Sequence, residues 1–446
     1  MPVSAIIGAQ FGDEAKGKVT DYLCARADIS VRYQGGPNAG HSVQPGEQMV
    51  VLHQLSAGIL RSGCVAVSGP GMVISPPSLL DELEGLRRQG ELRGELRVSE
   101  RAHVVLPLHR AQDGWEEKVR GVHATGTTLR GIGPAYMDRV GRWGIRMADL
   151  SRPEIIKQKL ELLYAAKKHL RDEVPDLPSI DTLTEELRQQ GLALKPYLAN
   201  TEPYLWGAAR SGKRIILEGA QSALLDVDFG TYPFVTSSHP TAAGALVGSG
   251  LPPQELDDVV GVAKAYSTRV GSGPFPTELE GAAADRLREM GGERGATTGR
   301  PRRCGWMDLV LLRYAARLNG FTSLAITKVD VLGGEPEVPV CVGYELPNGE
   351  RSDEYPPVLA EDLEAVSPVW RTFPGWGEFT PKLRARLAEQ GWRALPTELK
   401  RYLAFIGGET GAPVTVVSYG PRRDETVEVP PNAFETAAGI SEWHPN

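Results

Sequence analysis

The chain has 446 residues, of which 41% are hydrophobic and 24% are charged, which is typical of a globular protein with a large core. Its 49 Lys and Arg residues against 56 Asp and Glu residues give a net charge of −7, which argues against nucleic acid as a partner. The four cysteines form no C-x-x-C pair, so we expect no zinc or disulfide framework and a reducing cytoplasm. No apolar stretch approaches the roughly 20 residues of a membrane helix, and the first expected strand leaves no room for a signal peptide.

The chain opens on a phosphate-binding pattern. An apolar run at 3–8 predicts a buried strand, and residues 12–18, GDEAKGK, fit the G-x-x-x-x-G-K loop of nucleoside triphosphatases. Such loops hold phosphates with inward backbone N–H groups, the start of a helix and a lysine. Val19 stands where the motif usually has a Ser or Thr for magnesium, and Asp13 places a carboxylate inside the loop. That carboxylate weakens phosphate binding unless a cation or a reaction needs it, which predicts a catalytic loop.

Glycine-rich loops follow the next expected strands. A helix is predicted over 19–27 and a strand over 29–33, before the loop QGGPNAGHS at 34–42. Either a plain turn or a functional histidine, His41, accounts for this loop. The stretch GTTLRGIGPAY at 126–136 combines hydroxyls, glycines and an arginine, which suits either a second anion site or a solvated basic turn.

The middle of the chain alternates charged helices with polar loops. Residues 153–190 have charged helical spacing and predict a helical layer. Strands at 214–217 and 259–265 lead into loops rich in hydroxyls, at the strand ends where open α/β sheets bind ligands. The loop at 295–303 carries three arginines, whose guanidinium groups pair with carboxylates. It is either a binding loop for a small dicarboxylate or an exposed basic loop.

The strand expected at 323–326 ends in Thr327-Lys328-Val329-Asp330, which resembles the N/T-K-x-D signature of GTP-binding proteins. An aspartate there accepts hydrogen bonds from guanine, and the lysine stem covers the base. A helix is predicted over 306–318, a peripheral segment over about 340–395 and a last strand over 413–417. Because the first loop, TKVD and the last strand end would serve one nucleotide, we expect one domain over 1–446, although length alone suggests about three.

Together these motifs resemble the adenylosuccinate synthetase family over essentially the whole chain. The resemblance implies a large α/β domain with a central, mostly parallel sheet flanked by helices and with phosphate-loop-like GTP-binding elements. It also implies a homodimeric ligase that joins IMP and L-aspartate into adenylosuccinate, converts GTP to GDP and phosphate, requires Mg²⁺ and commits IMP to AMP synthesis. The stretches that carry it are GDEAKGK, QGGPNAGH, TTLRGIGPAY, EGAQ, GTYPFVTSS, KAYSTRVGSGPFPTEL, GATTGRPRRCGW, TKVDVL and SYGP.

The resemblance also assigns residue roles. Asp13 matches the base that removes the N1 proton of IMP so that O6 attacks the γ-phosphorus of GTP, and His41 and Gln221 match the other catalytic residues. Asp13 and the carbonyl of Gly40 match the ligands of one Mg²⁺ per subunit. The expected GTP-binding residues are Gly12, Asp13, Glu14, Ala15, Lys16, Gly17, Lys18, Gly40, His41, Ser42, Arg302, Lys328, Val329, Asp330, Ser418, Tyr419 and Gly420.

The same resemblance places IMP and aspartate. Arg142 would reach the IMP phosphate of the neighbouring subunit, so the homodimer would complete each site. The expected IMP-binding residues are Asp13, Glu14, Ala15, Lys16, Asn38, Ala39, Gly40, His41, Thr128, Arg142, Gln221, Thr236 and Arg300. The expected aspartate-binding residues are Ala296, Thr297, Thr298, Gly299, Arg300, Pro301 and Arg302.

Four residues depart from the family pattern, because Ala15, Leu129 and Ser222 stand where glycine is usual and Ser42 replaces a threonine. If position 15 needs a positive φ, alanine costs about 1 kcal/mol there. Leu129 and Ser222 flank the expected IMP pocket, which leaves a paralogue acting on another 6-oxopurine nucleotide, such as dGMP, as an alternative. A second alternative is a non-catalytic GTP-binding regulatory protein, which would explain TKVD but not His41 or the arginine loop.

Overall fold

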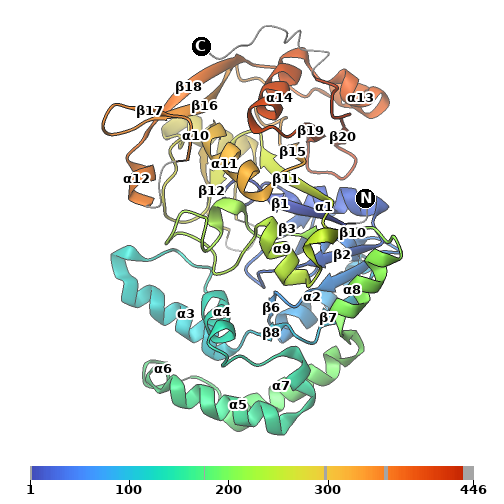
Figure 1. Cartoon of the computed structure of the whole chain (residues 1–446), viewed down its shortest axis with the longest axis vertical. Helices are drawn as coiled ribbons and strands as arrows, with labels where there is room; N and C mark the ends of the chain where they lie inside the picture. Colours follow the sequence, from blue (N-terminus) through green and yellow to red (C-terminus); the bar gives the residue numbers. More distant parts are fainter. Residues whose placement is uncertain (1–2, 175, 296–298, 356–359, 435–446) are drawn as a thin grey trace.

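A computed structural model describes residues 3–174, 176–295, 299–355 and 360–434. A ten-stranded sheet crosses the middle of the molecule (Figure 1). Neighbouring strands are parallel except for the antiparallel pair β19 and β20, which confirms the predicted α/β fold with a mostly parallel central sheet. In spatial order the strands are β20 (Thr426–Glu428), β19 (Val414–Ser418), β15 (Ser323–Thr327), β11 (Asp258–Lys264), β1 (Val3–Gly8), β10 (Ile215–Glu218), β2 (Ile29–Arg32), β5 (Val65–Ser68), β7 (Glu95–Ser99) and β9 (Leu198–Ala199).

The first strand of the chain, β1, lies between β10 and β11 and is buried on both faces. Ile7 joins the hydrophobic layer that includes α11 (Leu309–Asn319) and α14 (Thr397–Thr410), whereas Ile6 joins the layer under α1 (Lys16–Leu23). A strand covered by helices on both sides needs a continuous apolar run. The fold therefore places the end of β1, and the loop that follows it, at the centre of the sheet edge.

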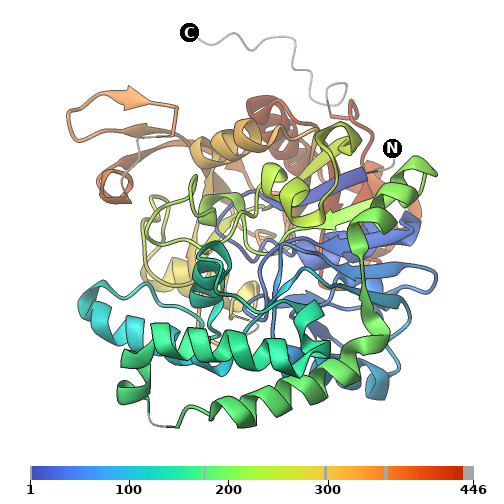
Figure 2. The same cartoon turned by 60° about the horizontal axis from the view of Figure 1, so that its bottom comes forward.

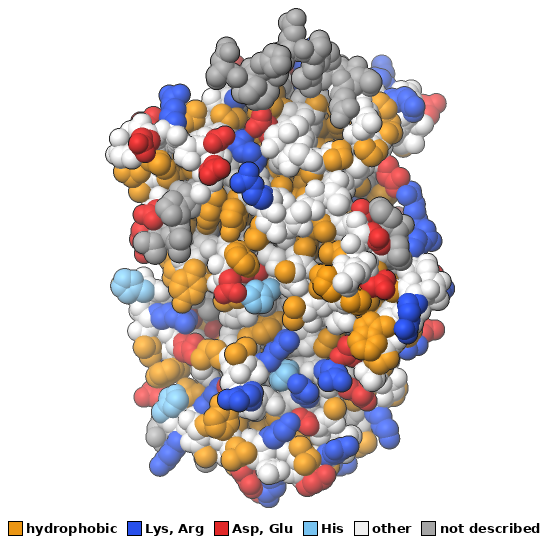
Figure 3. Space-filling view, in the orientation of Figure 1, with side chains coloured by type: hydrophobic (Ala, Val, Ile, Leu, Met, Phe, Trp, Pro, Cys, Tyr) orange, Lys and Arg blue, Asp and Glu red, His pale blue; other side chains and the backbone are white. Residues whose placement is uncertain are grey.

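A helical layer covers the lower end of the molecule in Figure 1. Its main helices, α5 (Pro153–Ala166) and α7 (Ile180–Leu194), lie side by side (Figure 2). Their buried leucines form a second hydrophobic core with α2 (Pro76–Gln89), while basic and acidic side chains are interspersed over the outer face of this end (Figure 3). The helices predicted from the charged spacing of residues 153–190 are confirmed as α5, α6 (Lys168–Glu173) and α7.

The remaining strands form smaller sheets that are separate from the central one. No helix among the described residues is long and apolar enough to cross a membrane. The remaining helices are α3 (Pro107–Arg120), α4 (Ile132–Val140), α8 (Thr201–Arg210), α9 (Ala242–Ser249), α10 (Gly281–Met290), α12 (Ala360–Glu364) and α13 (Pro381–Gln390). The remaining strands are β3 (His41–Val43), β4 (Val50–Leu52), β6 (Val73–Ile74), β8 (His103–Val104), β12 (Ser267–Arg269), β13 (Arg303–Gly305), β14 (Met307–Asp308), β16 (Glu337–Glu345), β17 (Arg351–Ser352) and β18 (Ser367–Pro374).

Two element boundaries differ from the prediction. The helix expected from residue 306 begins at Leu309, because the Asp308 side chain accepts a hydrogen bond from the backbone N–H of Leu311 and caps it. The strand at 413–417 is not the last one, since β20 follows it with three residues, too few to show a period. Within the segment expected to be peripheral, Val340 is buried in the main core, whereas the hairpin end that carries β17 projects from the molecule (Figure 2). The single domain over 1–446 stays a prediction.

Two of the three residues that replace a usual glycine lie in the left-handed backbone region. The φ angle is 62° at Ala15, the N-cap of α1, and 55° at Leu129. This conformation costs an L-residue about 1–2 kcal/mol because its Cβ approaches the following carbonyl oxygen. The expectation of strain at Ala15 is therefore confirmed.

Ala15→Gly is expected to raise the free energy of unfolding by about 0.5–1 kcal/mol, since relief of the left-handed strain exceeds the entropy that glycine adds to the unfolded chain. The midpoint of urea unfolding measures this change. Ala25→Gly is the matched control, because Ala25 is an exposed alanine within the 3₁₀ helix Cys24–Arg26 and its replacement should destabilise. A loss of stability at both positions would contradict strain at Ala15.

Candidate active site

The loops at the carboxyl ends of the central strands surround a cavity of about 1040 Å³. These loops follow β1, β2, β10, β15 and β19, so segments from both ends of the chain meet there. Most of the predicted site residues line this cavity. They are Gly12, Asp13, Ala15, Lys16, Gly17, Lys18, Asn38, Ala39, Gly40, His41, Ser42, Thr128, Gln221, Thr236, Arg302, Lys328, Asp330, Ser418 and Gly420.

The other predicted site residues do not line the cavity or are not described. Arg300 instead donates from NH1 to the carbonyl oxygen of Gly126 at 3.5 Å. Ala296, Thr297 and Thr298 lie outside the described residues. The described residues that were expected in the site but are absent from the cavity lining are Glu14, Arg142, Gly299, Arg300, Pro301, Val329 and Tyr419.

Strained backbone marks the cavity edge. The φ angles of Asp13, Ala15, Gln221 and Lys328 lie between 55° and 63°, although none of the four is glycine. Such residues persist only where the surrounding structure holds them, and they cluster at active sites. Three separate strand ends therefore each present at least one strained residue to the same cavity.

Glu14 lies beneath the phosphate loop and holds it from inside the protein. Its fully buried carboxylate accepts hydrogen bonds from the backbone N–H of Gly12 at 2.8 Å and from Lys16 Nζ at 2.6 Å. Burial raises the pKa of Glu14, but the charge and hydrogen bond of Lys16 outweigh burial and hold this pKa below its usual value. Ser222, also fully buried, donates from Oγ to the same carboxylate at 2.6 Å. Neither Ser222 nor Leu129 lines the cavity.

His41 is oriented by a buried carboxylate behind it. Its Nδ1 contacts Glu218 Oε1, while Glu218 Oε2 accepts hydrogen bonds from Ser56 Oγ at 2.6 Å and from the N–H of Ala57 at 2.8 Å. Burial raises the pKa of Glu218, but His41 and Arg32 together hold it below its usual value. Burial, followed by the Arg32 guanidinium, lowers the pKa of His41 to about 4. At pH 7 the imidazole is therefore neutral, with its proton on Nδ1 and a free lone pair on Nε2.

The end of the cavity expected to hold guanine contains an unused acceptor. Asp330 Oδ1 is buried and has no hydrogen-bond partner within the described part of the chain, while Oδ2 lies 3.4 Å from Arg384 NH2. A buried carboxylate oxygen without a partner suits the N–H donors of guanine. Lys18 reaches the same end, where Nζ donates to Ser418 Oγ at 2.7 Å and to Gly420 O at 2.5 Å. Burial lowers the pKa of Lys18 to about 8, although nearby carboxylates oppose this.

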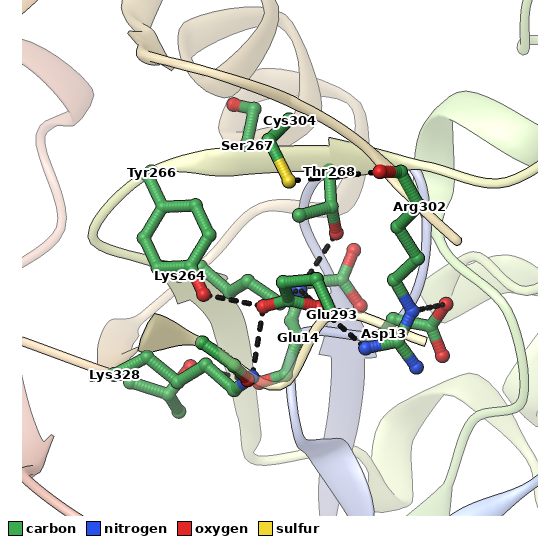
Figure 4. A network of polar contacts seen from close by, with 12 residues as sticks. Asp13, Glu14, Lys264, Tyr266, Ser267, Thr268, Glu293, Arg302, Cys304 and Lys328 are labelled. Atoms are coloured by element: carbon green, nitrogen blue, oxygen red, sulfur yellow. Dashed lines mark hydrogen bonds and ion pairs between the residues drawn. The ribbon is translucent and has the colours of Figure 1, made fainter. Parts of the chain in front are cut away.

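The arginine loop reaches the phosphate loop through Arg302. Its Nε lies 2.8 Å from Asp13 Oδ2, and its NH1 contacts the buried carboxylate of Glu293 (Figure 4). Arg303, the next residue, points elsewhere and pairs with Glu278. Of the arginines in this loop, Arg302 is thus the one that the fold places beside the expected catalytic base.

The expected magnesium ligands, Asp13 and Gly40, both line the cavity. A carboxylate and a peptide carbonyl supply the hard oxygen donors that Mg²⁺ prefers, so the donor chemistry fits. Among the described residues, the three-residue group with side-chain atoms close enough to hold an ion is a different one, Asp226, Asp228 and His239. Asp226 accepts a backbone hydrogen bond from Asp228 there and stabilises a turn.

Comparison with known proteins identifies the family. A family model described as adenylosuccinate synthetase matches residues 5–427. The chain belongs to the adenylosuccinate synthetase family. Adenylosuccinate synthetases from Caldanaerobacter subterraneus and a Parafrankia species are 44% and 48% identical to it over 431 residues, covering 96% of this chain and 99% of theirs.

Solved structures agree with this family. The fully ligated adenylosuccinate synthetase from Plasmodium falciparum matches with a TM-score of 0.88 at 35% identity, covering 96% of this chain and 100% of that one. A cyanophage S-2L succinoaminodeoxyadenylate synthetase, bound to dGMP and dATP, matches with a TM-score of 0.61 at 21% identity and covers 98% of each chain, a likeness of fold alone. The predicted family and its activity, a GTP-dependent ligase joining IMP and L-aspartate, are confirmed, which leaves the regulatory alternative without support.

Sequence reasoning missed the two acids that orient the cavity side chains. Glu218 begins the EGAQ stretch, and Glu293 follows the charged helix α10, so both read as ordinary polar residues. Their complete burial could not be predicted from spacing. The signal that was available is position, since Glu218 ends a strand and Glu293 comes shortly before the arginine loop.

We expect GTP affinity to fall as the pH rises through about 8, because Lys18 loses the charge that attracts phosphate. The charged form binds the anion and predominates below the pKa, so the Kd should rise with pH by up to about tenfold per unit. Lys18→Arg keeps its charge between about pH 7 and 9, so its Kd should stay level over that range. Equilibrium titration with a fluorescent GTP analogue measures both proteins, and parallel curves would assign the titration to another group.

Proposed function

We propose that this adenylosuccinate synthetase binds GTP, IMP and L-aspartate together in the 1040 Å³ cavity and performs both chemical steps with its own side chains. One observation carries the proposal: the cavity brings Asp13, His41 and Arg302 together with the Lys328 and Asp330 pair. A base, a hydrogen-bonding imidazole, a carboxylate-binding guanidinium and a guanine acceptor are the groups that the ligase reaction needs.

In the first step Asp13 removes the N1 proton of IMP, which moves negative charge onto O6. O6 attacks the γ-phosphorus of GTP, the bond from that phosphorus to the β-phosphate oxygen breaks, and GDP leaves. Neutral His41 presents Nε2, and the nearby phosphate charge raises its pKa so that it takes up a proton from solvent and donates it as a hydrogen bond to the oxygen being phosphorylated. Lys16 stabilises the charge that develops on the phosphate oxygens, and Lys18 adds positive charge from its position beside Ser418 and Gly420.

In the second step the amine of aspartate displaces the phosphoryl group. The C6–N bond forms, the C6–O bond breaks, phosphate leaves with the electron pair, and the amine passes a proton to the departing phosphate. Arg302 would orient the aspartate carboxylate by a bidentate contact. Gln34 Nε2 donates to Gln221 Oε1 at 3.2 Å, which leaves the Gln221 amide N–H groups to donate to the purine 6-substituent.

Magnesium is proposed at Asp13 and the Gly40 carbonyl, with one ion per subunit. When bound, the ion supplies positive charge that neutralises the phosphate oxygens of GTP. Lys16 belongs to the same loop and supplies a fixed charge beside it, because Glu14 holds its ammonium in place at 2.6 Å. The loop thus combines a bound metal ion with the permanent positive charge of Lys16.

IMP is the favoured purine over dGMP. The two residues that raised the alternative do not line the cavity: the Ser222 hydroxyl points inward to Glu14, and Leu129 lies on a turn, half exposed. The chain also retains Asp13 as a base. The identities of 44% and 48% to proteins named adenylosuccinate synthetase point the same way.

We also propose a cytoplasmic homodimer in which Arg142 completes the site of the partner subunit. Arg142 is exposed, has a φ of 66° and does not line the cavity of its own chain. A non-glycine residue held at positive φ on an exposed turn is a costly feature that a shared site would explain.

Ultraviolet absorbance of the purified protein with GTP, magnesium and L-aspartate tests the function, with IMP and dGMP offered separately. A spectral change with IMP alone is expected, whereas a change with dGMP alone, or with neither, would refute the proposal.

Asp13→Asn should slow turnover by about 10²–10⁴-fold, because a carboxamide cannot accept the N1 proton. Its GTP affinity, measured by titration without IMP, should change far less than turnover, and a turnover rate close to wild type would remove the base assignment.

Arg142→Leu should raise the KM for IMP by about tenfold or more, through loss of a charged contact to phosphate, while the KM for GTP stays unchanged. Initial rates at varied IMP, with sedimentation to confirm the dimer, provide the measurement. Arg152→Leu serves as the control, since Arg152 is another exposed arginine outside the cavity lining. Equal KM values for IMP in both variants would show that Arg142 does not bind the substrate.

A further inference from the structure

Glu293 lies at a junction of three cations that come from three separate segments (Figure 4). Its carboxylate contacts Lys264 Nζ at 2.9 Å, Lys328 Nζ at 2.8 Å and Arg302 NH1, and the Tyr266 hydroxyl donates to it as well. The Glu293 side chain is completely buried. Burial raises its pKa, but the three cations outweigh burial and hold this pKa well below its usual range.

The three cations differ in whether they reach the cavity. Lys264 is fully buried and serves Glu293 from within the protein, whereas Lys328 and Arg302 both line the cavity and reach back to Glu293. The two oxygens divide these partners, because Oε1 accepts from Lys328 and Oε2 pairs with Arg302. Lys264 alone would neutralise a buried carboxylate. Glu293 therefore does more than balance a buried charge, since it ties two cavity residues to one support.

Arg302 extends this chain of charges to the reactive end of the cavity. While NH1 stays on Glu293, Nε lies 2.8 Å from Asp13 Oδ2. The sequence Lys328, Glu293, Arg302, Asp13 is thus a continuous series of ion pairs. If Arg302 receives the aspartate carboxylate, Nε must leave Asp13, and the contact with Glu293 is what fixes the guanidinium during that exchange.

We propose that Glu293 is a positioning residue that couples the guanine-binding lysine, Lys328, to the aspartate-binding arginine, Arg302. The proposal rests on the function assigned to the cavity above. A guanine base that immobilises Lys328 holds its ammonium on Glu293 Oε1, and Glu293 holds Arg302 through Oε2, so the second ligand meets a guanidinium whose support is complete. The coupling is reciprocal, and GTP and aspartate favour each other's binding by the same factor.

The first test asks whether a change at the guanine end alters aspartate binding. Lys328→Met removes the ammonium but keeps the stem, and should raise the KM for L-aspartate about fivefold or more at saturating GTP. Asp330→Asn is the matched control, because it also weakens guanine binding but pairs with Arg384 and not with Glu293. Its KM for GTP should rise while its KM for aspartate stays at the wild-type value. An unchanged KM for aspartate in Lys328→Met, or equal increases in both variants, would overturn the proposal.

The second test removes the junction itself. Glu293→Gln should raise the KM values for both GTP and aspartate, and adding Lys328→Met to it should raise the KM for aspartate no further. Multiplication of the two effects would overturn the coupling, because independent sites contribute additively in free energy. Glu278→Gln is the control, since it removes a carboxylate from the neighbouring Arg303, outside the site, and should leave both KM values unchanged. Should Glu293→Gln fail to fold, the comparison of Lys328→Met with Asp330→Asn decides alone.

Direct binding separates this proposal from the proposed reaction. Equilibrium dialysis of labelled L-aspartate with the wild-type protein, with and without a non-hydrolysable GTP analogue, measures the coupling without turnover. Tighter aspartate binding with the analogue in the wild type, and its loss in Lys328→Met, support the coupling even if no adenylosuccinate forms in the activity assay. Equal binding with and without the analogue overturns the coupling even in an active enzyme.

Discussion

The cost of burying charge organises this active site. A cation or carboxylate removed from water is expensive unless it is paired, and three basic side chains that line the cavity each have a buried acid behind them. Glu14 supports Lys16 at 2.6 Å, Glu218 supports His41, and Glu293 supports Arg302. All three acids are fully buried at the side chain. The result is a set of polarised hydrogen-bond donors whose buried supports are in place before a phosphate arrives, and electrostatic catalysis depends on such preorganised donors.

Backbone strain and buried charge support each other in the first loop. Asp13 and Ala15 both have positive φ, and they flank Glu14, whose side chain points into the protein. Asp13, in contrast, faces the cavity. Two consecutive carboxylates therefore point in opposite directions: Asp13 faces the cavity, and Glu14 faces the protein interior and holds Lys16. Ser222, which stands where glycine is usual, reinforces this arrangement because its hydroxyl donates a hydrogen bond to Glu14.

The sequence was sufficient where function depends on spacing along the chain. The buried strand β1, the loop GDEAKGK and the tetrapeptide TKVD all follow local rules, and Asp13, Lys328 and Asp330 do line one cavity. The direction in which each side chain points was harder to predict. Glu14 was expected to contact substrates, but its carboxylate lies beneath the loop, and Ser222 was expected beside the purine, but it faces Glu14.

The supporting acids escaped prediction because nothing in their local sequence distinguishes them from solvated residues. Glu293 meets Lys264, Lys328 and Arg302 only because β11, β15 and the arginine loop converge in the folded sheet. The same convergence brings Arg302 against Asp13, which has two further roles in the proposed mechanism. In the proposed site it must serve the N1 proton, the metal ion and, before ligands bind, Arg302 at 2.8 Å. One carboxylate cannot satisfy all three at once, so ligands that engage Asp13 release the Arg302 Nε for the aspartate carboxylate. In the proposed coupling, Glu293 keeps that released guanidinium beside the cavity through its contact with NH1.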